Sequence, residues 1–177
     1  GPLKEAKVLF FPEGTSRSQI AETLEDQGVI TDARVMNAAS LVASFRGMSL
    51  KPGEYEFSPG VPMAGVLNAI ASGKVLTYKI TIPEGWTSQM ALARINSNDV
   101  LTGDPVAEIP EGAVIADTQV FRRGMTRAKL VEDMKSAQVK LIDEVWAKKP
   151  ADSILKTKEE MVTLASIVEK ETGKAEE

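Results

Sequence analysis

The sequence predicts an α+β protein in which short strands and amphipathic helices form two successive parts. Three observations support this fold class. Residues 7–57 read as strand, helix, helix and strand. A strand–turn–helix pattern then recurs at an offset of 71 residues. Finally, helical patterns occupy residues 124–149 and 157–172, which places helices rather than strands in the last third of the chain.

Composition restricts the chemistry that this chain can perform. Its 177 residues are 43% hydrophobic and 26% charged, as in ordinary soluble proteins, and the net charge of -4 provides no basic footprint for nucleic acid. No segment approaches the roughly 18 apolar residues that span a bilayer. The absence of cysteine and histidine excludes Ser-His-Asp and Cys-His catalysis and removes the commonest metal ligand. We therefore predict acid–base chemistry by Asp, Glu, Lys or Tyr, with no metal and no cofactor.

The first part of the chain begins with a short strand and a capped helix. Lys7–Phe11 is rich in β-forming residues, and the turn residues 12–14 end it. Thr15 or Ser16 caps the helix that follows, and Gly28 ends it.

A second helix starts after Thr31 or Asp32 and runs to about Phe45. Its inward face is predicted to consist of Val35, Met36, Ala39 and Val42.

Two strands and a third helix complete this part. Tyr55 and Phe57 alternate as in a half-buried strand within residues 50–57. A helix covers residues 62–72, and residues 75–82 alternate most clearly as a strand.

The turn sequence Pro-Glu-Gly occurs three times. Phe11-Pro12-Glu13-Gly14 falls on Ile82-Pro83-Glu84-Gly85, and the apolar positions behind the two turns also agree. These pairs are Leu24 with Ile95, Val29 with Val100, and Ile30 with Leu101. We interpret the first two copies as a duplicated unit, and the third, at residues 109–112, as recurrent turn chemistry.

A long helix is predicted over residues 124–149, with Thr126 as its cap and Pro150 as its stop. Its predicted apolar stripe consists of Leu130, Met134, Ala137, Leu141, Val145 and Trp146. Thr157 and Glu160 then form a capping box that opens the last helix.

The last helix combines an apolar stripe with carboxylates. Apolar residues fall at positions 161, 164, 165 and 168, and Glu169, Lys170 and Glu171 follow. The two glutamates flank the stripe, about 160° apart around the helix, whereas Lys170 points away from it. A carboxylate beside an apolar stripe can be partly desolvated, which suits it to donate a proton. Periodicity does not indicate which of the two glutamates would donate a proton. The alternative interpretation is an amphipathic helix with a charged, solvated end, in which neither glutamate is catalytic.

The segment Val162–Thr172, VTLASIVEKET, resembles the signature helix of the YceG-like family, the endolytic murein transglycosylases. The resemblance implies that Glu171, the second glutamate of E-K-E-T, is the catalytic residue. Residues 111–121 are similar to the family segment E-G-x-x-x-P-D-T-Y-x-F, matching it at Glu111, Gly112, Asp117, Thr118 and Phe121. Ala116 and Gln119 replace the usual proline and tyrosine. We take Asp117, Thr118 and Glu169 as candidate substrate-binding residues, with capping of a turn as the alternative role of Asp117.

The resemblance also implies a domain organisation. We assign residues 1–6 to a cleavage remnant and linker, residues 7–82 to a LysM-like strand–helix–helix–strand domain, and residues 83–177 to the start of the catalytic domain. LysM-like modules bind glycans that contain N-acetylglucosamine, although residues 7–82 contain no distinctive LysM motif. The alternative is a packing domain that only positions the enzyme.

The implied activity is cleavage of the MurNAc–GlcNAc backbone of peptidoglycan within the strand, leaving 1,6-anhydro-MurNAc ends and terminating nascent glycan strands. A peptidoglycan-binding or scaffold module without catalysis is the alternative. Aminodeoxychorismate lyase chemistry, a label that this family has carried, needs pyridoxal phosphate on a lysine, and the sequence contains no phosphate-cradling glycine-rich loop.

The resemblance further implies a single-pass anchor in the bacterial inner membrane, through a helix preceding this chain, with this part on the periplasmic side. The expected partners are peptidoglycan strands and cell-wall synthases, and no nucleic acid. Because the family continues well beyond Glu171, we expect the 177-residue chain to have little or no activity.

Overall fold

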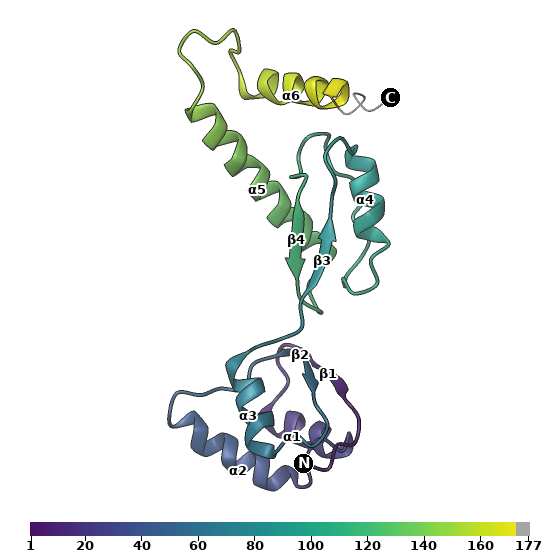
Figure 1. Ribbon diagram of the computed structural model, residues 1–177, viewed down its shortest axis with the longest axis vertical. Coiled ribbons are helices and arrows are strands. Elements are labelled where there is room, and N and C mark those ends of the chain that lie inside the picture. The colour runs from purple at the N-terminus through teal and green to yellow at the C-terminus, as the bar shows by residue number, and fades with distance from the viewer. Residues whose placement is uncertain (173–177) are drawn as a thin grey trace. The chain divides into compact units, whose positions relative to one another are not determined.

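The computed structural model describes residues 1–172 and divides the chain into two compact units (Figure 1). The first unit contains Gly1–Tyr78 and Arg122–Gly124, and the second contains Lys79–Phe121 and the chain from Met125 on. The described residues form six helices and two small sheets, which confirms the α+β class. Because this division rests on contacts alone, the domain limits 7–82 and 83–177 remain predictions.

The first unit has the predicted order of strand, helix, helix and strand, followed by a third helix. Its elements are β1 (Lys7–Phe11), α1 (Arg17–Asp26), α2 (Ala33–Ser44), β2 (Gly53–Phe57) and α3 (Met63–Ser72). β1 and β2 are antiparallel, with Lys7 opposite Phe57 and Phe11 opposite Gly53. A short two-stranded sheet is stable only when its apolar face is covered, and here the helices provide that cover.

Side-chain caps define where α1 and α2 begin. The Ser16 hydroxyl accepts a hydrogen bond from the Gln19 backbone amide, and Oε1 of the Gln19 side chain accepts one from the Ser16 backbone amide, forming a capping box. Asp32 accepts from the backbone N–H groups of Arg34 and Val35. In both helices the second of the two predicted cap residues is the one used.

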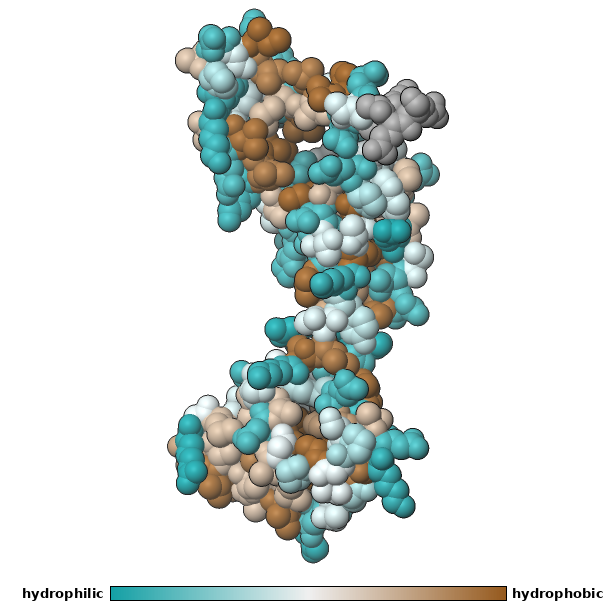
Figure 2. Space-filling view, viewed as in Figure 1, coloured by the Kyte–Doolittle hydropathy of each residue, from teal (hydrophilic) through white to brown (hydrophobic). Residues whose placement is uncertain are grey.

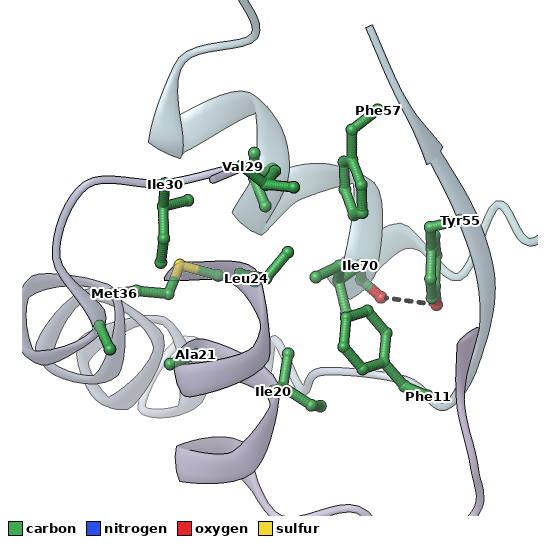
Figure 3. Packing of buried hydrophobic residues seen from close by; sticks show 12 residues of the cluster. Phe11, Ile20, Ala21, Leu24, Val29, Ile30, Met36, Tyr55, Phe57 and Ile70 are labelled. Atoms are coloured by element: carbon green, nitrogen blue, oxygen red, sulfur yellow. Dashed lines mark hydrogen bonds between the residues drawn. The ribbon is translucent and has the colours of Figure 1, made fainter. Parts of the chain in front are cut away.

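A single apolar core joins the strand pair to the three helices (Figure 3). Tyr55 and Phe57 are buried, as their alternation predicted. The Tyr55 hydroxyl lies 2.8 Å from the Lys51 carbonyl oxygen and 3.2 Å from that of Ile70, so its polar end is satisfied inside the core. The same burial raises the pKa of Tyr55. The other fully buried side chains are Phe11, Ile20, Leu24, Val29, Met36, Val66 and Ile70.

The predicted inward face of α2 is confirmed at Met36 and wrong at Val35 and Val42, while Ala39 is half-buried. Val35 and Val42 are 54% and 56% exposed, while the buried residues of this helix are Ala33, Met36, Ser40 and Ala43. Small side chains at three of these four positions let α2 approach α1 closely. The prediction assigned the larger aliphatic side chains to the core, whereas close helix packing selected the small ones.

Glu54 forms a buried polar cluster that the sequence did not reveal. Its carboxylate accepts from the Arg123 guanidinium at 2.7 Å and from the Tyr78 hydroxyl. Tyr78 and Arg123 both belong to the first unit, although the residues between them, Lys79–Phe121, belong to the second. The hydrogen bonds with Tyr78 and Glu54 raise the pKa of Arg123. A buried carboxylate is tolerated only when it is paired, and these contacts supply the pairing.

The second unit contains β3 (Tyr78–Thr81) except its first residue, α4 (Ser88–Asn96), β4 (Thr118–Phe121), α5 (Arg127–Ala147) and α6 (Lys158–Thr172). β3 pairs with β4. β3 is shorter than the predicted strand over residues 75–82, because the Leu76 amide bonds the Glu54 carbonyl instead of a β4 partner.

The repeat at an offset of 71 residues is visible in both units. Ser16 caps α1, and Thr87, at the equivalent position, caps α4. The turn residue is a glycine at positive φ in both, +84° at Gly14 and +73° at Gly85. Three equivalent pairs are buried in both copies: Phe11 with Ile82, Leu24 with Ile95, and Ile30 with Leu101.

We predict that Leu24→Ala destabilises the protein by about 2–5 kcal/mol, because Leu24 is fully buried and its truncation leaves a cavity. Leu41→Ala, the same chemical change at an exposed position of α2, is expected to change stability by no more than about 0.5 kcal/mol. Urea unfolding followed by circular dichroism measures both. Equal losses in the two variants would contradict this placement of the core.

Candidate functional site

The helix that carries the candidate catalytic glutamate begins at a complete capping box. The Thr157 hydroxyl accepts from the Glu160 amide at 3.1 Å, and the Glu160 carboxylate accepts from the Thr157 and Lys156 amides. This confirms the predicted start of α6. An exposed ion pair of 2.6 Å between Lys158 and Asp143 links the beginning of α6 to α5.

The two candidate carboxylates lie near the C-terminal end of α6. Glu171 is exposed and Glu169 is half-buried. Their spacing on a regular helix places them about 160° apart, so the two carboxylates do not form a pair. The Thr172 hydroxyl donates to the Val168 carbonyl at 2.9 Å and closes the last described turn. The two carboxylates therefore project from different sides of α6.

The apolar stripe of α6 is on the surface. None of the side chains of Lys158–Thr172 is buried, and Leu164, Ile167 and Val168 are all exposed. The second half of α5 is similar, because Leu141 and Val145, which we predicted to face the core, are exposed as well.

Only the first half of α5 carries buried side chains, at Leu130, Val131 and Met134. Figure 2 shows apolar surface gathered over α5 and α6. Within the described residues, the predicted stripe of α5 is therefore a core face only in its first turns.

The third Pro-Glu-Gly turn, residues 109–112, connects three helices of the second unit. The Glu111 carboxylate accepts from the Ser88 amide at 3.0 Å, so it places negative charge at the N-terminus of α4. The Ser88 hydroxyl donates to the Pro110 carbonyl at 2.9 Å. The Gly112 carbonyl accepts from the Gln138 side chain of α5 at 3.0 Å.

Gly112 also lies directly against α6. A Cβ atom at this position would be 3.3 Å from Cγ1 of Val162, and the residue has φ of +73°. The positive φ therefore favours glycine, and a larger residue would also require Val162 to shift by a few tenths of an ångström. We interpreted this turn as recurrent turn chemistry; the structure adds that it contacts the helix that carries Glu171.

Asp117 and Thr118 have local structural partners. Asp117 Oδ1 accepts from the Thr118 amide at 2.6 Å, and its carbonyl accepts from the Ile82 amide at 3.1 Å. The Thr118 hydroxyl bonds that of Thr81 at 2.8 Å. Both residues are exposed. These contacts fit the turn-capping alternative for Asp117, and binding of substrate by Asp117, Thr118 or Glu169 remains a prediction.

Both tryptophans of the chain are half-buried and stack with cations of their own unit. The Arg94 guanidinium lies 4.5 Å from the Trp86 ring and also donates to the Thr81 carbonyl. The Lys149 ammonium lies 5.0 Å from the Trp146 ring. Each ring is therefore held in place, and one face of each is engaged with a cation.

The first unit contains two hollows. The larger, about 490 Å³, is open and lined mainly by acidic and polar side chains of α1 and the preceding turn, including Glu13, Glu22 and Asp26. Among the residues that the structure describes, no three His, Cys, Asp or Glu side chains are grouped to hold a metal ion.

The smaller hollow, about 210 Å³, is a groove between the start of α1, the C-terminal half of α2 and residues 48–50. Its lining mixes hydroxyl groups, aliphatic surface and one guanidinium. The lining residues are Thr15, Arg17, Ile20, Ser40, Ser44, Met48, Ser49 and Leu50.

A family model described as the YceG-like family matches residues 9–177. Because the match covers nearly the whole chain, the protein belongs to the YceG-like family, as the sequence of α6 predicted. No curated protein matches the chain significantly.

The crystal structure of a yceG-like protein from Listeria monocytogenes aligns with 81% of this chain and 57% of that one, at 20% identity and a TM-score of 0.38. The chain thus spans less than two thirds of the length of that protein. None of the described helices is both long and apolar enough to cross a lipid bilayer.

We predict that Gly112→Ala destabilises the second unit more than Gly85→Ala does. Both glycines end a Pro-Glu-Gly turn at φ of +73°, so each variant incurs the same left-handed strain of about 1–2 kcal/mol. Only at Gly112 does the new methyl group also contact Val162, whereas nothing lies within 4 Å of it at Gly85. Urea unfolding gives the difference, and hydrogen exchange of the α6 amides locates it. Equal exchange in the two variants would contradict docking of α6 on this turn.

Proposed function

We propose that this protein is an endolytic peptidoglycan transglycosylase that cuts the glycan between MurNAc and GlcNAc, and that Glu171 is its catalytic residue. The observation that carries the proposal is the YceG-like signature LASIVEKE, which lies on α6 with Glu171 exposed. Membership of the family supports the reaction class. Cutting within a growing strand would terminate its elongation.

In the proposed reaction, protonated Glu171 donates its proton to the glycosidic oxygen that leaves with GlcNAc, and the bond from this oxygen to C1 of MurNAc breaks. The Glu171 carboxylate so formed takes the proton of the MurNAc 6-hydroxyl, while the oxygen of that hydroxyl bonds to C1 of the same sugar. The products are a free GlcNAc 4-hydroxyl and a 1,6-anhydro-MurNAc end, and no water is consumed.

One carboxylate is sufficient for this sequence, because the first step converts the acid into the base that the second step needs. A hydrolase requires a second carboxylate on the other side of the sugar, to attack it or to activate water. Glu169 projects about 160° away from Glu171 and is not placed for that task. The geometry of α6 therefore favours the single-residue lytic scheme.

The same proposal includes the setting of the reaction. The substrate is the peptidoglycan strand, the partners are cell-wall synthases that make it, and the location is the periplasmic face of the bacterial inner membrane, with a single-pass anchor. No cofactor participates.

We predict that Glu171→Gln lowers lytic activity by at least about a thousandfold, because glutamine cannot exchange the proton in either step. Glu169→Gln, the same change on the other side of α6, is expected to leave kcat within about threefold and, because Glu169 is a predicted substrate-binding residue, to raise KM instead. Muropeptide analysis of peptidoglycan digested by the full-length protein measures anhydro-MurNAc ends. Reducing ends in their place would indicate a hydrolase, and equal loss in both variants would contradict the single-carboxylate scheme.

A second candidate function is glycan binding by the first unit, either beside catalysis or in its place. The groove of about 210 Å³ supports it, because hydroxyl groups next to aliphatic surface suit a sugar ring. The Ser44 hydroxyl is exposed and donates to a carbonyl of its own helix, which leaves its lone pairs for a ligand.

We predict that Ser44→Phe fills this groove and weakens binding of chitin oligomers about tenfold, which corresponds to about 1.4 kcal/mol. Ser72→Phe is the matched control, because Ser72 also ends a helix, is exposed and donates to the carbonyl three residues earlier. Calorimetric titration compares the variants with the original chain. If the original chain does not bind, or if both variants bind as it does, the groove has no such role.

A further inference from the structure

The helix α2 carries apolar side chains on two opposite faces. One face packs into the first unit against α1 and α3. The other, which we call the outer face of α2, consists of Val35, Ala38, Leu41, Val42 and Phe45. At about 100° per residue these five positions fall within one arc of roughly 120°, opposite the buried residues. All five are exposed, and Phe45 is 85% exposed.

The outer face of α2 has more exposed apolar surface than a surface helix normally has. A helix that is apolar all round is typical of a buried helix, because a surface helix normally turns charged residues to water. Arg34 is the only charged residue within Ala33–Ser44. The core of the first unit is already complete on the other side of α2, so its folding does not require this face to be covered.

The charges around the outer face are basic. Arg34 lies at its N-terminal end and Arg46 follows Phe45 at its C-terminal end, and the chain has no acidic residue between Asp32 and Glu54. Asp32 accepts from two backbone amides and pairs with Arg34 at 3.1 Å, so it offsets part of the Arg34 charge, whereas no ion pair is formed by Arg46 among the described residues. The Arg34 side chain remains 92% exposed.

These charges disfavour a second copy of the chain as the occupant. Two outer faces packed antiparallel about their centre would place Arg34 of one copy near Arg46 of the other. A parallel arrangement would bring identical arginines together. A negatively charged partner removes this repulsion in either orientation.

We propose that the outer face of α2 docks onto an anionic lipid surface, with Leu41, Val42 and Phe45 entering the interface and Arg34 and Arg46 contacting lipid phosphates. Figure 1 shows α2 along one edge of the first unit. Partner helices usually occupy a groove, whereas a single convex helix with an apolar face and basic flanks is typical of an interfacial helix. This inference does not depend on transglycosylase activity.

The test is flotation of the 177-residue chain with vesicles of phosphatidylglycerol and phosphatidylcholine, compared with vesicles of phosphatidylcholine alone. We expect binding to the anionic vesicles that weakens as salt is raised from about 50 to 500 mM, because basic residues near an anionic surface are screened. Phe45→Glu is expected to abolish it. Ile154→Glu, which introduces the same charge at a position of the second unit that is also 85% exposed, is expected to leave it unchanged.

A second pair of variants tests the charges. Arg46→Gln is expected to weaken binding about fivefold, whereas Lys74→Gln, at an exposed position just after α3 in the same unit, is not. Absence of flotation, equal loss in Phe45→Glu and Ile154→Glu, or equal binding to both vesicle types would overturn the proposal. So would a concentration-dependent dimer that Phe45→Glu converts to a monomer, since the occupant would then be a second copy. Unchanged thermal unfolding verifies that each variant is folded.

Discussion

The Pro-Glu-Gly turn is the local constraint on which both units depend. In each of its three copies the glycine occupies a left-handed conformation, which redirects the chain. The first two copies lead into the capped starts of α1 and α4, so one device sets the entry angle of an equivalent helix in each unit. The third copy is used differently. Its Glu111 carboxylate places negative charge at the N-terminus of α4, and Gly112 lies against α5 and α6, so this turn connects the signature helix to the rest of its unit.

Most of the local structure could be predicted from the sequence, and the errors share one cause. Caps depend on neighbouring residues, and for this reason Ser16, Thr126 and the Thr157–Glu160 box were predictable. The buried face of α2 was not, because it depends on how closely a second helix approaches. The same holds for the second half of α5, where Leu141 and Val145 satisfy the periodicity but remain exposed. Periodicity identifies an apolar face; it does not identify the surface that covers it.

The candidate site divides in the same way. The signature of α6 identifies Glu171 by resemblance to the family, and the exposure of that residue agrees with contact to a large substrate. In contrast, the contacts of the Glu111–Gly112 turn join residues more than twenty positions apart, such as Glu111 with Ser88 and Gly112 with Gln138. No local pattern predicts them. These contacts give Glu111 and Gly112 structural roles, whereas the chemistry is proposed for the carboxylate of Glu171.

The two exposed apolar surfaces have different physical meanings. The outer face of α2 lies opposite the residues that α2 contributes to the core of the first unit. The first unit can therefore fold without covering this face, which remains available to an external partner. In contrast, α6 has no buried residue, so its apolar stripe is the face through which this helix would pack. A proton donor works best where water is excluded. Transglycosylase chemistry at Glu171 therefore requires the α6 stripe to be covered during the reaction, by substrate or by protein. This requirement connects the packing of α6 directly to its proposed catalytic role.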